Sequence, residues 1–185
     1  MLNEIQNEAR DNMEKALDAL KKQLTSIRTG RANISMLDGI RVDYYGTPTP
    51  LNQIANVTTP DARLIMVKPY EKQLLKEIEK AIVDSNIGLT PGNDGDVLRL
   101  PIPALSEERR KEYVKQAKGR CEDAKVAVRN ARRDANEMLK EATKESEISE
   151  DDEKRGLKLV QDLTDEYVKR VDELFVKKEG EIMEV

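Results

Sequence analysis

The chain has 185 residues, of which 37% are charged against about 25% in a typical globular domain, and its formal net charge is −4. It contains no histidine and one cysteine, which excludes Ser-His-Asp and Cys-His catalysis, histidine-containing zinc sites and an internal disulfide. The start of the chain is unlike a signal peptide, and no apolar run is long enough to span a membrane, so we expect a soluble, cytoplasmic protein.

The first 29 residues predict one amphipathic helix. Apolar residues recur there at spacings of three and four, and the pattern ends before Gly30, a residue type common at helix C-termini. The apolar positions are Leu2, Ile5, Ala9, Met13, Ala16, Leu20, Leu24 and Ile27.

The middle of the chain predicts a small α/β module inserted into a helical frame. All seven prolines and six of the nine glycines lie between residues 30 and 103, and such residues gather where a chain changes direction. The predicted elements are a half-buried strand at 40–44, a turn at 46–50, a strand at 64–67, a helix at 71–83 that ends near Gly88, and a strand at 97–100.

One loop in this module, Asn93–Asp96, has the acidic composition of a calcium-binding loop. It lacks the ligand spacing and the terminal glutamate of an EF-hand, so we expect a turn and no metal. The common Gly-rich phosphate-binding motifs are also absent, and we expect no cofactor and no small-molecule substrate.

The segment from Ser106 to about Lys144 predicts a second, long helix. Its apolar residues alternate at spacings of three and four, which is a heptad seam made mostly of alanine, so the helices that pack on it must approach closely. We expect Cys121, which lies in the seam, to be a small core residue. The seam consists of Val114, Ala117, Cys121, Ala124, Val128, Ala131, Ala135, Met138 and Ala142.

A third helix follows a break at 146–152, with an apolar stripe that starts at Leu157 and ends at Leu174. The predicted class is therefore α+β: an elongated three-helix bundle formed by 1–29 and 105–185, with a small α/β domain at 30–104. The chain crosses between the two parts twice, and the breaker residues at these crossings predict a hinge. The predicted hinge residues are Gly30, Arg31, Pro101, Ile102 and Pro103.

The charge of the second helix is strongly divided along its length. The segment from Arg109 to Arg133 contains ten basic and three acidic residues, a local charge of +7. The segment 134–153 contains nine acidic and two basic residues, a local charge of −7. At 100° per residue, seven of the basic residues lie along one exposed line of the helix, which we call the basic face. The sequence has no signal for dimerisation, so we expect a monomer. The basic face consists of Lys111, Lys115, Lys118, Lys125, Arg129, Arg132 and Arg133.

The basic face alone allows two interpretations. It is either a solvated face opposite the charges of a neighbouring helix, or a surface that binds the phosphates of RNA or DNA, for which the planar guanidinium of arginine is well suited. In the inserted domain, Tyr45 is expected to point outward beside two Thr-Pro units, which makes Tyr45, Pro48 and Pro50 candidate partner contacts.

Several motifs together closely resemble the bacterial ribosome recycling factor family. The resemblance extends over essentially the whole chain and keeps the order of the motifs, which makes it highly specific. The motifs are Arg28–Ala32, Asp38–Ile40, Tyr44–Leu51, Ser106–Lys111, Val126–Asn136 and Ile148–Asp152.

The resemblance implies a hinged, L-shaped molecule with the outline of a transfer RNA and with no enzymatic activity. It implies binding to the large ribosomal subunit after termination and, with elongation factor G and the hydrolysis of GTP by that factor, splitting of the ribosome. The bundle of this family contacts ribosomal RNA, and the small domain faces elongation factor G. Carried over by motif and by charge, the expected contacts to ribosomal RNA are Arg110, Lys118, Lys125, Arg129, Arg132 and Arg133.

Two other interpretations stay open from the residues themselves. A coiled-coil adaptor that binds protein helices would have no salt-sensitive affinity for ribosomes. A hydrolase that uses paired carboxylates and a metal would lose activity with a chelator.

Overall fold

The computed structural model describes residues 1–184, which divide into two compact units. One unit combines Met1–Arg28 with Glu107–Met183, and the other combines Thr29–Ser106 with Glu184. The predicted α+β class, a three-helix bundle with a small inserted α/β domain, is confirmed. No helix among the described residues is both long enough and apolar enough to cross a membrane.

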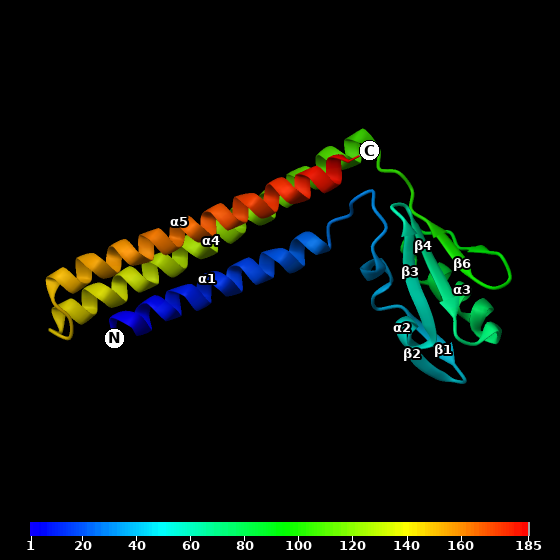
Figure 1. Cartoon of the computed structure of the whole chain (residues 1–185), viewed down its shortest axis with the longest axis horizontal. Coiled ribbons are helices and arrows are strands. Elements are labelled where there is room, and N and C mark those ends of the chain that lie inside the picture. Colours follow the sequence, from blue (N-terminus) through cyan, green and yellow to red (C-terminus); the bar gives the residue numbers. More distant parts are fainter. Residues whose placement is uncertain (185) are drawn as a thin grey trace. The chain divides into compact units, whose positions relative to one another are not determined.

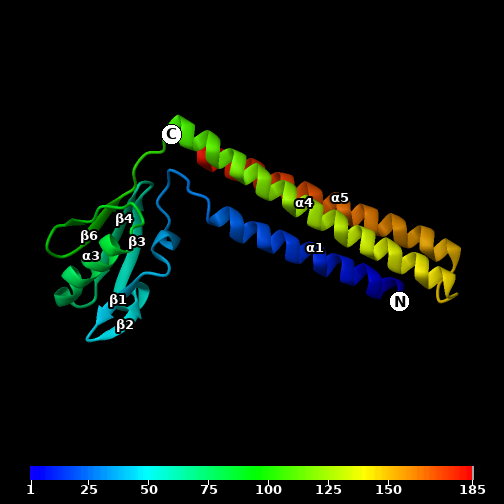
Figure 2. The same ribbon diagram turned by 180° about the vertical axis from the view of Figure 1, so that it is seen from behind.

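The bundle consists of α1 (Leu2–Thr25), α4 (Glu107–Lys144) and α5 (Glu150–Met183), and each helix packs against the other two. Figures 1 and 2 show the three helices side by side, with α1 parallel to α5 and antiparallel to α4. Ser149 caps the start of α5, because its hydroxyl accepts the backbone N–H of Asp152 at 3.1 Å. In return, the Ser149 hydroxyl and then the Ser149 backbone N–H hydrogen-bond the Asp152 carboxylate, which holds the pKa of that carboxyl below its usual range.

The seam of α4 is buried as expected over most of its length, but it shifts by one residue toward its end. Leu139 is completely buried, whereas the predicted Met138 is only partly buried against the core. A straight α-helix drifts by about 20° per heptad from a strict seven-residue repeat, so the position facing the core moves on after several repeats. The same kind of correction applies in α1, where Leu17 is 1% exposed and the predicted Ala16 is half-buried.

The described part of the small unit holds two antiparallel sheets and two α-helices. β1 (Arg41–Tyr44) and β2 (Thr47–Pro50) form a hairpin. The larger sheet has the order β3-β4-β6-β5, built from β3 (Ala55–Asp61), β4 (Leu64–Pro69), β5 (Gly92–Asn93) and β6 (Leu98–Pro101). A short helix, α2 (Leu51–Ile54), precedes β3, and α3 (Leu75–Asp84) lies between β4 and β5.

Three predictions for this unit need correction. Residues 47–50 form an edge strand and not a turn, because Pro48 and Pro50 need no ladder N–H in a two-stranded ribbon. The predicted helix at 71–83 starts with a 3-10 turn and ends at Asp84, and Asn86 then adopts a left-handed backbone with φ of 56° before Gly88 is reached. The last strand begins at Leu98, one residue later than predicted.

The predicted hinge segments lie partly inside the small unit. Pro101 is the last residue of β6, and Ile102 is 7% exposed with its backbone N–H donating to the Arg63 carbonyl at 2.8 Å. On the other crossing, the Ala32 N–H donates to the Ala62 carbonyl at 2.6 Å. Because Pro101 and Ile102 belong to the fold of the small unit, the segments that connect the two units are shorter than predicted and consist of residues 29–31 and 103–106.

Candidate nucleic-acid interface

The first part of the basic face carries three exposed lysines. Lys111 forms an ion pair with Glu107 one turn earlier, with 3.4 Å between Nζ and Oε1. Lys115 and Lys118 are exposed and have no ion-pair or hydrogen-bond partner among residues 1–184. These lysines are flexible point charges that can approach phosphates without fixing an orientation.

Lys125 is less exposed than predicted, and it joins two helices. Its side chain is 18% exposed, and its ammonium lies 2.5 Å from Asp172 of α5 and 3.6 Å from Glu122. The hydrogen bond to Asp172 is the main cause that raises the pKa of Lys125. The expectation that Lys125 is exposed on the basic face is therefore corrected, because its charge is neutralised by acidic side chains on α4 and α5.

Glu122 divides the basic face. It is exposed and lies on the same line of α4 as Lys115 and Arg129, at 100° per residue. Its pairing with Lys125 gives a stretch with no surplus positive charge between an N-terminal lysine group and a C-terminal arginine group. The basic face is therefore two patches and not one continuous stripe.

The second patch is the arginine patch, defined by Arg129, Arg132 and Arg133. Arg133 is exposed and Arg129 is half-buried, and neither has a partner in the part of the chain that the structure describes. Arg132 is half-buried and donates from Nη1 to Oε1 of Gln161 on α5 at 3.4 Å. Gln161 is neutral and itself donates to Asp165 at 2.8 Å, so it orients the Arg132 guanidinium without neutralising it.

Arg110 lies apart from both patches. It is half-buried, and its Nε is fully enclosed and has no hydrogen-bond partner within residues 1–184. At 100° per residue, Arg110 lies seven residues before Ala117 of the seam and so points partly toward the seam. An enclosed N–H without an acceptor is energetically costly, which makes Arg110 the least relaxed of the candidate cations.

The arrangement of the arginine patch favours phosphate recognition. Three guanidiniums gather within about one helical turn, and planar forks match the oxygen pairs of a phosphate. Two residues of this neighbourhood, Gln161 and Asp172, were missed at the sequence level. Both reach α4 from α5, and a helical wheel drawn for one helix carries no signal about side chains from another.

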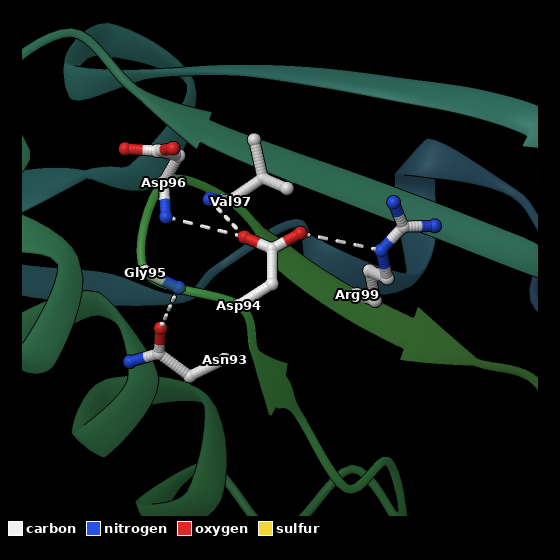
Figure 3. A network of polar contacts seen from close by, with 6 residues as sticks. All are labelled: Asn93, Asp94, Gly95, Asp96, Val97 and Arg99. Atoms are coloured by element: carbon white, nitrogen blue, oxygen red, sulfur yellow. Dashed lines mark hydrogen bonds and ion pairs between the residues drawn. The ribbon is translucent and has the colours of Figure 1, made fainter.

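The acidic loop of the small unit is a turn. As Figure 3 shows, the Asp94 carboxylate accepts the backbone N–H groups of Asp96 at 3.1 Å and Val97 at 2.9 Å, and Arg99 Nε at 3.4 Å. The N–H of Val97 is the main cause that lowers the pKa of Asp94. Among the described residues no group of three or more cysteine or acidic side chains is placed to hold a metal ion.

The candidate partner contacts sit on the β1–β2 hairpin. Tyr45 is 72% exposed, Pro48 is exposed and Pro50 is half-buried. Tyr44 and Tyr45 both donate hydrogen bonds from their hydroxyls to the carboxylate of Glu71, a residue that sequence reasoning did not connect to them.

In the bundle, Cys121 is 3% exposed and burial raises its pKa to about 11, so its predicted role as a small core residue is confirmed.

The sequence and the fold are similar to one family of proteins. Residues 20–183 match the family described as Ribosome recycling factor. The chain is 50% identical to the ribosome-recycling factor of Desulforapulum autotrophicum and 54% identical to that of Listeria welshimeri, each over 185 residues covering all of both chains.

Two solved structures resemble the chain over its full length. A solution structure of the ribosome recycling factor has a TM-score of 0.76 and 38% identity, covering 100% of this chain and 98% of that one. The T. thermophilus factor, described with E. coli elongation factor G bound to the E. coli post-termination complex, has a TM-score of 0.65 and 46% identity over all of both chains.

Proposed function

The chain belongs to the ribosome recycling factor family, and on this premise we propose that the arginine patch of α4 anchors it to ribosomal RNA of the large subunit. The protein is a non-catalytic translation factor that acts on post-termination complexes together with elongation factor G. A ribosome partner implies a cytoplasmic location, and we infer that the factor acts as a monomer.

The observation that carries the anchoring proposal is the uncompensated charge of the arginine patch. Arg129 and Arg133 have no acid partner among the described residues, and Arg132 contacts only a neutral amide. A purely solvated face would favour cross-helix ion pairs such as Lys125–Asp172, and the arginine patch has none. Lys118 and Arg110 extend the proposed contact toward the start of α4, whereas Lys125 is assigned to holding α4 and α5 together.

The proposed mechanism is mechanical. Elongation factor G engages the small unit, with Tyr45, Pro48 and Pro50 as contacts, and the displacement reaches the bundle through the two crossings. The bundle then disrupts contacts between the ribosomal subunits. We place the hinge at Gly30, Arg31 and Pro103–Ser106, since Pro101 and Ile102 are held by β6 and the core of the small unit.

The anchoring proposal is tested by measuring affinity for large subunits by sedimentation across a salt series. Arg129→Ala and Arg132→Ala should each weaken binding and lower the slope of log K against log salt by about 0.7 to 0.9, one phosphate contact each. Lys140→Ala is the matched control, because it removes an exposed cation from the acidic part of the same helix. Unchanged slopes in both arginine variants, with an unchanged circular dichroism spectrum, would contradict the anchor.

The mechanical proposal is tested by lengthening one crossing. Six Gly and Ser residues inserted after Ala104 should leave large-subunit binding intact, because the anchor lies on α4. Splitting with elongation factor G should fall, because a slack connection does not transmit a displacement. Wild-type splitting in this variant would rule out transmission through the crossing.

A further inference from the structure

Glu71 is half-buried, and among residues 1–184 only hydroxyl groups donate hydrogen bonds to its carboxylate. Tyr44 donates to Oε1 at 2.8 Å and Tyr45 donates to Oε2 at 2.9 Å. No cation among residues 1–184 forms an ion pair with Glu71. Each carboxylate oxygen accepts one phenol and keeps a second lone pair, so the site has a free negative charge and free acceptor capacity.

Aromatic side chains surround this carboxylate. The rings of Tyr44 and Tyr45 meet edge to face, with 4.7 Å between centroids and 73° between planes. Tyr70, next to Glu71 in the chain, is 68% exposed. A hollow of about 210 Å³ opens here, and Glu71 is its one ionisable acid or base besides the tyrosines. The hollow is lined by Tyr44, Thr49, Gln53, Ile54, Tyr70, Glu71 and Leu74.

The backbone of Tyr45 has an unfavourable left-handed conformation, and this conformation occurs at a residue that contacts Glu71. Tyr44 pairs with Thr47, so Tyr45 and Gly46 form a two-residue hairpin loop, with φ of 48° and 85°. Both positions of such a loop favour glycine or asparagine, and a bulky side chain with positive φ is uncommon. The strained residue is the one whose hydroxyl reaches Glu71, and strain of this kind gathers at functional positions.

We propose that Tyr44, Tyr45, Tyr70 and Glu71, the tyrosine–carboxylate cluster, form a receptor for an arginine side chain of elongation factor G. This inference rests on the function proposed above. The aromatic faces and the carboxylate both attract a cation, and a guanidinium can stack on a ring while forking onto the free lone pairs. The same carboxylate repels phosphate, so the observations favour a protein partner over RNA.

Two variants test the cluster in the full-length protein. Glu71→Gln keeps the size and an acceptor oxygen but removes the charge, and Tyr45→Asn removes one ring while suiting the left-handed backbone. Each should raise the concentration of elongation factor G that gives half-maximal splitting by about 5- to 30-fold, the range expected for a partly desolvated cation–aromatic contact. Large-subunit binding should stay unchanged, and Tyr45→Asn should not lower the melting temperature.

Glu77→Gln is the matched control, because Glu77 is an exposed acid of the same unit without a partner among the described residues. An unchanged half-maximal concentration in both test variants would overturn the proposal. Equal losses in large-subunit binding would overturn it too, because the cluster would then face the ribosome. Failure of the wild-type protein to split ribosomes would instead refute the proposed function.

A direct probe keeps the receptor testable in that last case. Titration of the free protein with arginine amide should shift the ring signals of Tyr44, Tyr45 and Tyr70 in NMR spectra, and Glu71→Gln should abolish the shifts. Absence of shifts in the wild-type protein at tens of millimolar arginine amide would overturn the proposal independently of any ribosome assay.

Discussion

Helix α4 of the bundle and the small unit bury different kinds of side chain. Most of what α4 buries is alanine, together with Cys121 and two larger residues, Val128 and Leu139. The small unit buries isoleucine, leucine and valine almost throughout, with Ala55 as its one small apolar core residue among those described. A core of small side chains is intolerant of added atoms, and a core of large ones is intolerant of lost atoms. The α4 side of the bundle core and the core of the small unit should therefore respond in opposite ways to changes in volume.

The largest effect should come from truncation in the small unit. Ile78 of α3 is completely buried, and Ile78→Ala should lower the stability of this unit by about 2 to 5 kcal/mol through lost burial and a cavity. Hydrogen exchange of individual amides measures it: β4 and β6 amides should exchange faster, and α4 amides should keep their protection. Ile78→Val serves as the milder control. Equal loss of protection in α4 would show that the two cores are not independent.

Enlargement in the bundle should come next. A β-carbon at Gly156 of α5 would lie 2.7 Å from Leu139 Cδ2 and 3.0 Å from Leu2 Cδ1, so it would press on both neighbouring helices. Gly156→Val should destabilise the bundle by about 1 to 3 kcal/mol, read from the urea midpoint of the helical signal. Gly119→Val is the control, because a side chain there meets open space. Equal costs at both positions would contradict the idea of a volume-limited core.

A polar contact between α1 and α5 should contribute less. Tyr167 donates to the Glu14 carboxylate, Arg170 lies 3.3 Å from that carboxylate, and the Arg170 guanidinium sits 4.9 Å above the Tyr167 ring. The Tyr167 hydrogen bond is the main cause that lowers the pKa of Glu14 from its ordinary value of 4.5. Tyr167→Phe should cost about 1 kcal/mol at pH 7, discounted for the partial exposure of Glu14.

The pH dependence of this variant follows from the sign of the shift. A carboxyl whose pKa is lowered by folding contributes stability above pH 4.5 and loses it as the pH falls through the folded-state value. The urea midpoints of the wild-type protein and Tyr167→Phe should therefore converge as the pH falls below 4.5. A difference that stays constant from pH 7 to pH 3 would assign the effect to packing.

The smallest effect should come from the ion pair between Lys125 and Asp172. Asp172 is 57% exposed, so Asp172→Asn should cost only about 0.5 kcal/mol. Glu173→Gln is a neighbouring control on α5. Large-subunit affinity should not fall in Asp172→Asn, because the change frees a cation on α4 rather than removing one. Weaker binding would show that Asp172 positions Lys125 for the ribosome.

The same contrast between the units explains what the sequence could predict. The bundle helices repeat one spacing over many turns, so their approximate bounds and most of their buried positions follow from the sequence. The first helix ends at Thr25, earlier than predicted, and the buried positions Leu17 and Leu139 were each missed by one residue. The elements of the small unit are four to seven residues long in places, too short for a periodic signal at 47–61. The candidate site divided likewise: the cations follow from α4, whereas Gln161, Asp172 and Glu71 depend on contacts between distant segments.

Because Cys121 is buried, the rate at which its thiol is alkylated measures how often the bundle opens. With a pKa of about 11, roughly one thiol in 10⁴ is ionised at pH 7, and the side chain is 3% exposed, so alkylating reagents reach it when the bundle opens. The rate of labelling then reports the opening of α4 away from α1 and α5. An exposed cysteine introduced on the small unit would therefore react with a thiol-reactive fluorophore first, and Cys121 would stay unlabelled in the native protein.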